Sequence, residues 1–242
     1  MQKNPSDLVL RSPQMTACGF SHGFSLGPLD FRGMRLGECV TQLATEVGFE
    51  PEDLYQVSQV HGANVRIARG DRQAALRAEA DALVAFSSET PRTVGVRVAD
   101  CTPVLVADEA SGAVVAIHAG WRGVVAGVIS AGVSALDAKR PAGLVAAIGP
   151  CIGVCCFEVG DDVAAQIAEA CGDPSVVVRT YGDKPHVDMR RATRAQLRAA
   201  GMTDDRIDDV EGCTKCGGER FHSHRRDGEK AGRAIAVICA RG

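Results

Sequence analysis

Three side chains that bind transition metals, His61, Cys101 and His118, each occur where a strand-like run of the sequence ends. Imidazole nitrogen and thiolate sulfur are donors that zinc accepts in a tetrahedral shell. Three protein ligands leave one position open, which is typical of a catalytic zinc that polarises a substrate oxygen or lowers the pKa of bound water. The three residues are far apart in the sequence, so their spacing alone is a weak signal. If they meet, we expect one zinc per chain at this site.

Residues beside these ligands are candidates for binding substrate. Asp100 precedes Cys101 and could accept a hydrogen bond from an imidazole N–H, although an acidic residue there can equally cap a strand end. The stretch "HAGWRG" (118–123) predicts the end of a strand, a glycine turn and a helix that starts near Gly123. Such a turn favours anions, and Arg122 would add positive charge. The alternative is that the glycines only permit the turn and Arg122 is solvated.

A second basic segment, "RFHSHRRDGEKAGR" (220–233), contains Arg225 and Arg226. Planar guanidinium groups suit phosphate or carboxylate, and Asp227 could hold one of the two arginines in place. Arg225 and Arg226 are therefore candidate substrate ligands, and Arg225 is also a candidate catalytic residue. The alternative is a solvated basic turn, because short charge runs are common on loops.

Ten cysteines occur among the 242 residues, which fits reduced thiols, buried small residues or metal ligands better than a disulfide framework. Cys213 and Cys216 form a CxxC motif, which is half of a zinc site. Cys151, Cys155 and Cys156 could supply the remainder, but "PCIGVCC" is not a second CxxC. We favour spare thiols in a reducing cytosol, and a structural zinc bound by four cysteines is the alternative.

The elements that position these residues follow an α/β pattern. The runs "PVLVAD" and "AVVAIH", joined by "EASG", suit a hairpin, which indicates a mixed sheet. Without a long linker or an internal repeat, we expect one layered α/β sandwich domain over residues 1–242. Valine- and isoleucine-rich runs predict strands, and helical periodicity predicts helices. The predicted strands cover 54–60, 64–68, 81–86, 93–99, 103–108, 113–118, 144–150, 175–179 and 233–241, and the helices 123–140, 160–172 and 190–201.

The composition favours a small-molecule ligand. The 27 basic and 30 acidic residues give a net charge of −3, which is no reason to expect nucleic acid or a membrane surface as partner. The chain starts with a polar segment and has no apolar run long enough to span a bilayer, so we expect a cytoplasmic protein. The sequence does not predict the oligomeric state.

With these segments assembled, the chain closely resembles the bacterial YfiH family, also called the multicopper polyphenol oxidase or laccase-domain family. The resemblance runs from "CGFSHGFS" (18–25) onward. It rests on "QVHG" (59–62), "ADALV" (80–84), "ADCTPVLVAD" (99–108), "HAGWRG" (118–123), "IGPCIG" (148–153), "CFEV" (156–159), "SHRRDG" (223–228) and "AGR" (231–233).

The resemblance implies that His61, Cys101 and His118 are zinc ligands, in a sandwich fold distantly similar to cysteine-hydrolase toxins. It also implies an enzyme of purine nucleosides: phosphorolysis of adenosine, inosine and methylthioadenosine to base and (methylthio)ribose 1-phosphate, and adenosine deamination. Two departures stand out. "SHGFS" replaces a longer N-terminal loop, and an Asn-Arg pair expected near residue 40 is missing. "RFHSHRRDG" replaces the more usual "FFSYRRDG", so His222 and His224 receive no role from the resemblance.

Two other functions stay open. The older family label implies a copper-dependent, laccase-like polyphenol oxidase, but six histidines with one His-x-His are few for a multicopper centre. A single copper on two histidines, one cysteine and a weak methionine is conceivable by ligand type. The remaining alternative is a cysteine hydrolase with Cys101 as nucleophile and His118 as base.

Overall fold

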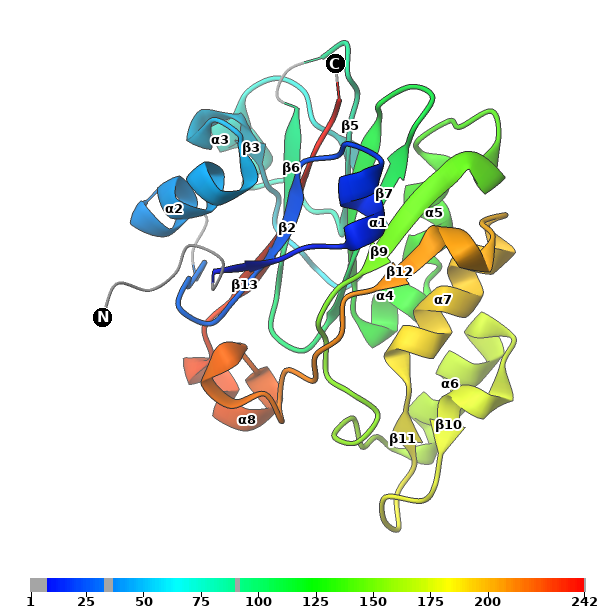
Figure 1. The fold of residues 1–242 in the computed structure, drawn as a ribbon. Helices are drawn as coiled ribbons and strands as arrows, with labels where there is room; N and C mark the ends of the chain where they lie inside the picture. Colours follow the sequence, from blue (N-terminus) through cyan, green and yellow to red (C-terminus); the bar gives the residue numbers. More distant parts are fainter. Residues whose placement is uncertain (1–7, 33–36, 90–91, 242) are drawn as a thin grey trace.

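Two mixed β-sheets lie at the centre of the structure, a computed structural model that describes residues 8–32, 37–89 and 92–241 (Figure 1). In the five-stranded sheet, β3 is parallel to β6 and the other neighbours are antiparallel. Its order is β1 (Val9–Leu10), β2 (His22–Ser25), β13 (Ala234–Cys239), β6 (Thr93–Val98) and β3 (Leu54–Tyr55). The predicted domain limits, residues 1 and 242, fall outside the described residues.

The six-stranded sheet carries most of the strands that the sequence predicts. The hairpin of β7 and β8 is antiparallel, as expected, whereas the two edge strands are parallel to their neighbours. The order is β12 (Ile207–Asp209), β9 (Leu144–Ile148), β7 (Thr102–Asp108), β8 (Val114–Ala119), β5 (Ala82–Ala85) and β4 (Val65–Ile67). The mixed sheet predicted from the hairpin is thus confirmed.

Side chains that alternate along the central strands build two cores. In β7, Val104 and Val106 pack under helices, while Leu105 and Ala107 face the five-stranded sheet. Both faces are buried, which explains why this strand reads as a continuous apolar run. The helices on the outer face are α4 (Trp121–Val125), α5 (Val128–Ser134), α6 (Asp161–Cys171) and α7 (Met189–Ala199).

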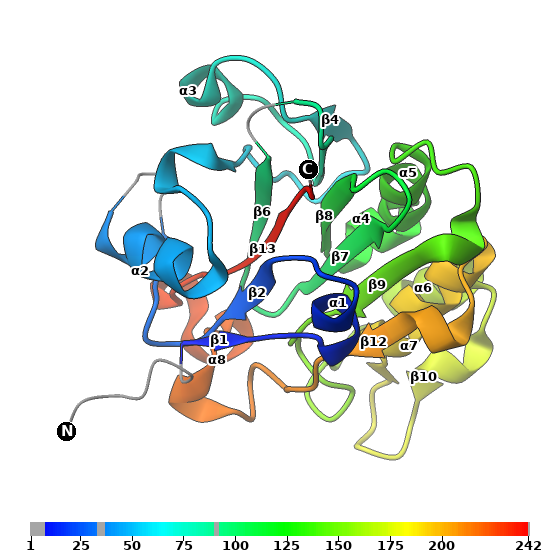
Figure 2. The same cartoon turned by 45° about the horizontal axis from the view of Figure 1, so that its top comes forward.

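A third core lies on the far side of the five-stranded sheet, where α2 (Glu38–Val47) covers β13 (Figure 2). The result is the layered mixed α/β architecture that the sequence predicts. The remaining elements are α1 (Pro13–Ala17), α3 (Arg72–Ala75), α8 (His224–Asp227) and the ribbon of β10 (Val177–Val178) and β11 (His186–Val187), besides short 3-10 helices at 51–53, 141–143, 174–176, 204–206, 218–220 and 228–230.

Three predicted elements differ from the structure. The strand expected over 175–179 is reduced to β10 (Val177–Val178), because Pro174–Val176 form a 3-10 helix. The strand expected over 54–60 stops at Tyr55, because the Gln59 side chain replaces the backbone pairing beyond it. Gln59 donates to the Arg97 carbonyl and accepts from the Arg97 amide, both at 2.8 Å. The helix expected over 123–140 is broken, since Gly127 adopts a left-handed φ of 84° between α4 and α5.

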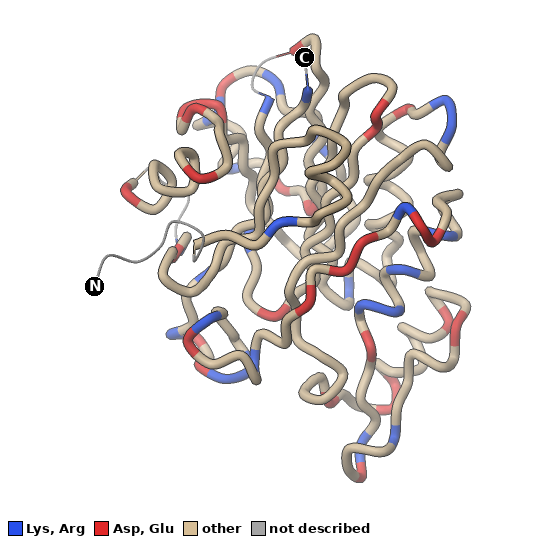
Figure 3. The backbone as a smooth tube through the Cα atoms, in the orientation of Figure 1, with Lys and Arg blue, Asp and Glu red and all other residues tan. Residues whose placement is uncertain are grey.

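Charged residues of both signs are distributed along the backbone (Figure 3), with no long run of one sign in the part of the chain that the structure describes. Within the same residues, none of the helices combines the length and the apolar character that crossing a membrane requires.

Candidate active site

The structure brings the three predicted metal ligands together. His118 lies near the end of β8, Cys101 directly precedes β7, and His61 lies in the turn that follows Gln59 instead of at a strand end. One donor atom from each residue lies within 4.8 Å of the other two, and His61 Nε2 is 3.8 Å from Cys101 Sγ. The rings of His61 and His118 meet edge to face, with 4.7 Å between their centres. Two imidazoles and a thiol at this separation fit the ligand set of zinc.

Asp81, which precedes β5, orients two of these ligands. Its side chain is fully buried, and Oδ1 contacts His118 Nδ1 at 2.8 Å. The same carboxylate accepts hydrogen bonds from the backbone amides of Val60 (3.3 Å), His61 (2.9 Å) and Gly62 (2.7 Å). The contact through Nδ1 leaves Nε2 of His118 for the metal, an arrangement common for metal-binding histidines.

The prediction that Asp100 accepts from an imidazole is therefore wrong, because Asp81 has that role. Asp100 instead accepts from the Thr214 hydroxyl (2.5 Å) and the Arg225 amide (2.6 Å), and so joins the Cys101 segment to the start of α8. Asp81 lies in the "ADALV" motif, which by itself predicts a strand and is part of the resemblance to the family.

Two residues of the site have left-handed backbone conformations that non-glycine residues rarely adopt. The φ angle is 62° at His61 and 86° at Asp100. The hydrogen bond from the His61 amide to Asp81 holds the backbone at His61, and the hydrogen bond from the Arg225 amide holds the backbone at Asp100. Such backbone strain persists where surrounding contacts over-determine it, typically at functional sites.

Gly120 explains part of the sequence "HAGWRG". A Cβ at this position would lie 2.9 Å from His61 Cδ2 and 3.2 Å from Cys101 Sγ. Only glycine therefore allows the backbone to pass this close to two metal ligands. The following helix α4 begins at Trp121, two residues before the predicted start, and has five residues.

Cys101 and His118 shift each other's protonation. Burial raises the pKa of the Cys101 thiol, but the opposite charge and hydrogen bonding of His118, together with His61, outweigh burial and lower that pKa to about 6. Burial lowers the pKa of His118, but Cys101 and Asp81 outweigh it and raise that pKa to about 9. In the metal-free protein these shifts favour the thiolate form of Cys101 and the imidazolium form of His118.

The three ligands line a cavity of about 500 Å³, a size typical of small-molecule binding sites. Besides residues already described, the cavity is lined by Arg97, Arg233, Trp121, Phe157 and His224. Burial lowers the pKa of Arg97, and the positive charge of Arg233 lowers it further. Within the described residues, the buried Nε of Arg97 has no hydrogen-bond partner. Two arginines that repel each other in one cavity are suited to an anion.

Sequence reasoning missed Arg97 and Arg233. Arg97 is the one charged residue of β6, a strand that is otherwise buried. A lone arginine in such a strand is a signal that sequence reasoning can use.

The other predicted substrate ligands have different positions. Arg225 lines the cavity, and its Nη1 donates to the carbonyls of Cys156 (3.4 Å) and Glu158 (3.1 Å). Arg122 does not line it; its guanidinium lies 4.4 Å from the centre of the Trp121 ring.

Arg226 does not line the cavity either, because its guanidinium is used within the fold. Nη1 donates to the carbonyls of Thr214 (3.1 Å) and Gly218 (2.8 Å), and Nη2 donates to that of Phe221 (2.9 Å). Asp227 holds the same group through Nε and Nη2, as the sequence suggested. The structure thus contradicts a substrate contact for Arg226.

All ten cysteines are free of disulfide bonds. Cys213 and Cys216 lie close to Cys155 and Cys156, however, so these four are not spare thiols scattered over the fold. Cys151 is fully buried and does not belong to the group.

Comparisons with known proteins identify the family of the chain. Residues 34–241 match the family described as multi-copper polyphenol oxidoreductase laccase. Purine nucleoside phosphorylase of Deinococcus radiodurans is 38% identical over 231 residues, which cover 89% of this chain and 85% of that protein. Adenosine deaminase RL5, from an unknown prokaryotic organism, is 33% identical over 216 residues, 85% of this chain and 82% of that protein.

Two further comparisons concern a longer relative and a solved structure. Purine nucleoside phosphorylase LACC1 of Mus musculus is 31% identical over 211 residues; the match covers 84% of this chain but only 47% of that protein. The crystal structure of YlmD from Geobacillus stearothermophilus has a TM-score of 0.84 at 27% identity, with 97% of each chain covered.

Proposed function

The chain belongs to the family described as multi-copper polyphenol oxidoreductase laccase, and we propose that it is a zinc-dependent enzyme of purine nucleosides. The proposed reactions are phosphorolysis of adenosine, inosine and methylthioadenosine to base and (methylthio)ribose 1-phosphate, and deamination of adenosine. The observation that carries the proposal is that one cavity holds both the His/Cys/His donor set and the pair Arg97 and Arg233. Asp100 is the one acidic residue among the described residues that line this cavity. Two relatives, a purine nucleoside phosphorylase and an adenosine deaminase, support the same class of substrate by the activities in their names.

Arg97 and Arg233 would bind inorganic phosphate. The unpartnered Nε of Arg97 offers a buried donor, and an anion would relieve the repulsion between the two guanidinium groups. In phosphorolysis a phosphate oxygen forms the bond to C1′ while the bond from C1′ to the purine nitrogen breaks. The purine leaves with the bonding electrons and then takes up a proton. Fixed positive charge beside such a reaction is usually a large catalytic contribution.

Trp121 and Phe157 supply the aromatic rings of the cavity lining. A purine is flat and aromatic, so it can stack on either ring, as aromatic groups do in offset or edge-to-face pairs. Arg225 would add a further positive charge for the phosphate co-substrate, the anionic reactant, while its Nη1 stays bound to the carbonyls of Cys156 and Glu158.

His61, Cys101 and His118 would hold the zinc, because their donor atoms converge and Asp81 presents His118 through the correct nitrogen. Zinc at this position would polarise a substrate oxygen or lower the pKa of a water molecule, which deamination of adenosine to inosine and ammonia requires. The protein's own contribution is to orient the ligands and keep Cys101 ionised. The proposal includes a cytoplasmic setting, in which thiols stay reduced.

The test is a nucleoside assay of the zinc-loaded protein with and without inorganic phosphate. Release of base with formation of ribose 1-phosphate, only when phosphate is present, supports phosphorolysis; inosine formed from adenosine supports deamination. Cys101→Ala should abolish both activities, whereas Cys171→Ser, on α6 and outside both cysteine-containing groups, should keep them. A zinc-loaded protein that leaves all three nucleosides intact would refute the proposal.

Arg225→Lys tests the anion contact. Lysine keeps a positive charge but loses the planar fork, so we expect an unchanged melting temperature and a large loss of kcat/KM. Early unfolding, or turnover equal to that of the wild type, would contradict the role of Arg225 in substrate binding.

One observation favours a second candidate, a cysteine hydrolase. In a hydrolase Cys101 would be the nucleophile, His118 the base, and Asp81 the carboxylate that orients His118. The lowered pKa of the Cys101 thiol suits a nucleophile. One thiolate cannot easily serve as both zinc ligand and nucleophile. Zinc should therefore activate the nucleoside enzyme and inhibit the hydrolase, and a chelator should do the reverse.

A further inference from the structure

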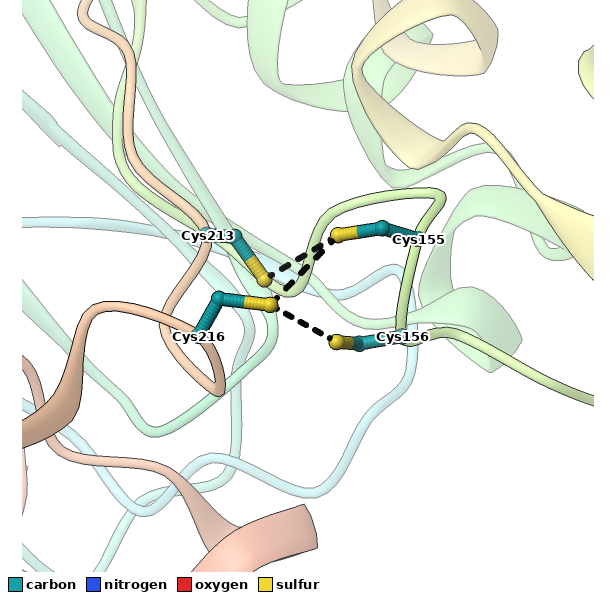
Figure 4. Close-up of side chains that lie close together, drawn as sticks. All are labelled: Cys155, Cys156, Cys213 and Cys216. Carbon is teal, nitrogen blue, oxygen red and sulfur yellow. Dashed lines mark hydrogen bonds between the residues drawn. The ribbon is translucent and has the colours of Figure 1, made fainter. Parts of the chain in front are cut away.

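Four cysteines from two separate loops converge beside the active-site cavity. Figure 4 shows Cys155 and Cys156 facing Cys213 and Cys216, with the sulfur atoms directed toward one another. Cys155 Sγ lies 3.7 Å from both Cys213 Sγ and Cys216 Sγ, and Cys156 Sγ lies 3.1 Å from Cys216 Sγ. All four sulfur atoms lie within 4.8 Å of one another.

These separations fit a tetrahedral metal site. Zinc–sulfur bonds of about 2.3 Å place the sulfur atoms of a regular tetrahedron about 3.8 Å apart. From this geometry we propose that Cys155, Cys156, Cys213 and Cys216 bind a second, structural zinc ion. The site differs from the His/Cys/His site, because four protein ligands leave no position open for a substrate.

The backbone around the sulfur atoms suits thiolates. The Gly153 amide donates a hydrogen bond to Cys213 Sγ at 3.2 Å, a contact that stabilises negative charge on sulfur. A Cβ at Gly153 would lie 3.1 Å from Cys213 Cβ and 3.2 Å from Cys155 Sγ, so glycine gives the sulfur atoms their room. The Gly217 amide donates to the Cys213 carbonyl at 2.9 Å and closes the turn that presents the CxxC pair.

Zinc would be held by four thiolates, so each thiol releases its proton on binding. No oxidant or reductant takes part. Without a cation, four thiolates at this distance would repel one another, and neutral thiols bind metals weakly.

The ion would fix one wall of the cavity. Cys156 precedes Phe157, a lining residue, and its carbonyl accepts from Arg225. On the opposite loop, the Thr214 hydroxyl donates to Asp100. The zinc would thus join the two loops that hold Arg225 and Asp100, without contacting substrate itself.

Metal analysis of the full chain, expressed with zinc, tests this site. We expect two zinc ions per chain in the wild type, one in Cys101→Ala and one in a Cys155→Ser, Cys216→Ser variant. Cys171→Ser should keep both ions. In the Cys101→Ala background, cobalt titration of the metal-free protein should give the intense thiolate charge-transfer absorption of a tetrahedral four-sulfur site.

The cobalt experiment keeps the proposal testable if the serine variant fails to fold. The proposal is wrong if Cys101→Ala protein binds no zinc and gives no such spectrum. It is also wrong if protein purified without oxygen contains a disulfide among the four cysteines, seen as the loss of two hydrogens in the intact mass, or contains iron with acid-labile sulfide. Each result is independent of nucleoside turnover.

Discussion

Replacing Asp81 by asparagine removes one acceptor oxygen from the most connected carboxylate of the site. Oδ1 serves His118 Nδ1 and the His61 amide, and Oδ2 serves the amides of Val60 and Gly62. Whichever way the new amide points, its NH₂ group faces two donors. A buried donor without an acceptor costs about 1–3 kcal/mol, and one or two donors lose their acceptor depending on the tautomer of His118, so Asp81→Asn should lose about 1–6 kcal/mol of unfolding free energy. That is a large part of the stability of a typical domain, about 5–15 kcal/mol.

The same substitution should weaken zinc binding. If asparagine donates to Nδ1, the proton of His118 moves to Nε2, the nitrogen that the metal needs. Loss of an orienting partner of this kind typically lowers metal affinity about 10–100-fold, which corresponds to about 1.4–2.7 kcal/mol. Chemical denaturation of the metal-free protein measures the loss of unfolding free energy. Competition with a zinc indicator measures the loss of zinc affinity.

Asp100→Asn is the matched control. Asp100 also lies beside a metal ligand, but among the described residues its carboxylate accepts from the Thr214 hydroxyl and the Arg225 amide and not from an imidazole, so zinc affinity should stay at the wild-type value. If Asp100→Asn weakens zinc binding and Asp81→Asn does not, the assignment of the orienting carboxylate is wrong.

The acid side of the stability curve gives an independent check on Asp81. Burial raises its pKa, but His118 and the backbone amides outweigh burial and hold the pKa below the ordinary value. The stabilisation is therefore complete above the unfolded value of about 3.9 and is lost as the pH falls through the folded pKa. The difference in unfolding free energy between the wild type and Asp81→Asn should therefore become smaller as the pH falls through that range. A difference that stays constant would contradict the ionised form.

Three further predictions concern other residues of the site. Metal-free protein should be alkylated at Cys101 with a midpoint near pH 6, the value to which its pKa is lowered, and zinc should block the reaction; a midpoint near that of an ordinary thiol would contradict the thiolate. Gly120→Ala should destabilise the protein by about 1–3 kcal/mol and lower zinc affinity, because its Cβ meets both ligands, whereas Gly143→Ala, with open space around its Cβ, should be neutral or slightly stabilising. Arg97→Gln should raise the KM for phosphate about tenfold or more, because a charge-assisted hydrogen bond contributes about 1.5–3 kcal/mol, and exposed Arg66→Gln on β4 should not; equal phosphate KM values would remove Arg97 from the anion site.

The layered fold and the metal donors were predictable because their signals are local. Alternating and continuous apolar runs gave most strands of the six-stranded sheet, and the hairpin gave its mixed character. His61, Cys101 and His118 were identifiable by donor chemistry and by motif, although they come from three separate segments. Gln59 shows the limit of periodicity, since a side chain took over the pairing that apolar residues predicted.

Asp81 and the cysteine group depend on tertiary structure. Asp81 lies 37 positions from His118, and an aspartate before a strand usually indicates only a turn. Cys155 and Cys213 are 58 positions apart, and no sequence rule fixes the loop that brings them together. Arg226 was misassigned for a related reason, because the carbonyl groups that bind it cannot be seen from residue types.

The positions of the six histidines test whether the chain can hold the multicopper centre that the family's description suggests. His22, His186 and His222 are bound within the fold: His22 to the Ser12 amide and the Phe20 carbonyl, His186 to the Val154 carbonyl, and His222 to the Leu29 carbonyl. The other three, His61, His118 and His224, line the cavity. Within residues 8–32, 37–89 and 92–241, the groups suited to a metal are the His/Cys/His set and the four cysteines. Neither is a multicopper centre, which needs several imidazole-rich sites in contact.

Copper should therefore compete for the zinc site instead of filling a copper centre of its own. Protein prepared without added copper should act on purine nucleosides at full rate and oxidise phenols feebly. Because copper binds nitrogen and sulfur donors more tightly than zinc, added copper should raise phenol oxidation while nucleoside turnover falls in proportion to the zinc displaced. Zinc content, copper content and both activities, measured on the same samples, test this exchange. Stoichiometric copper in several distinct sites with fast phenol turnover, and a zinc form inert toward adenosine and inosine, would favour the oxidase instead.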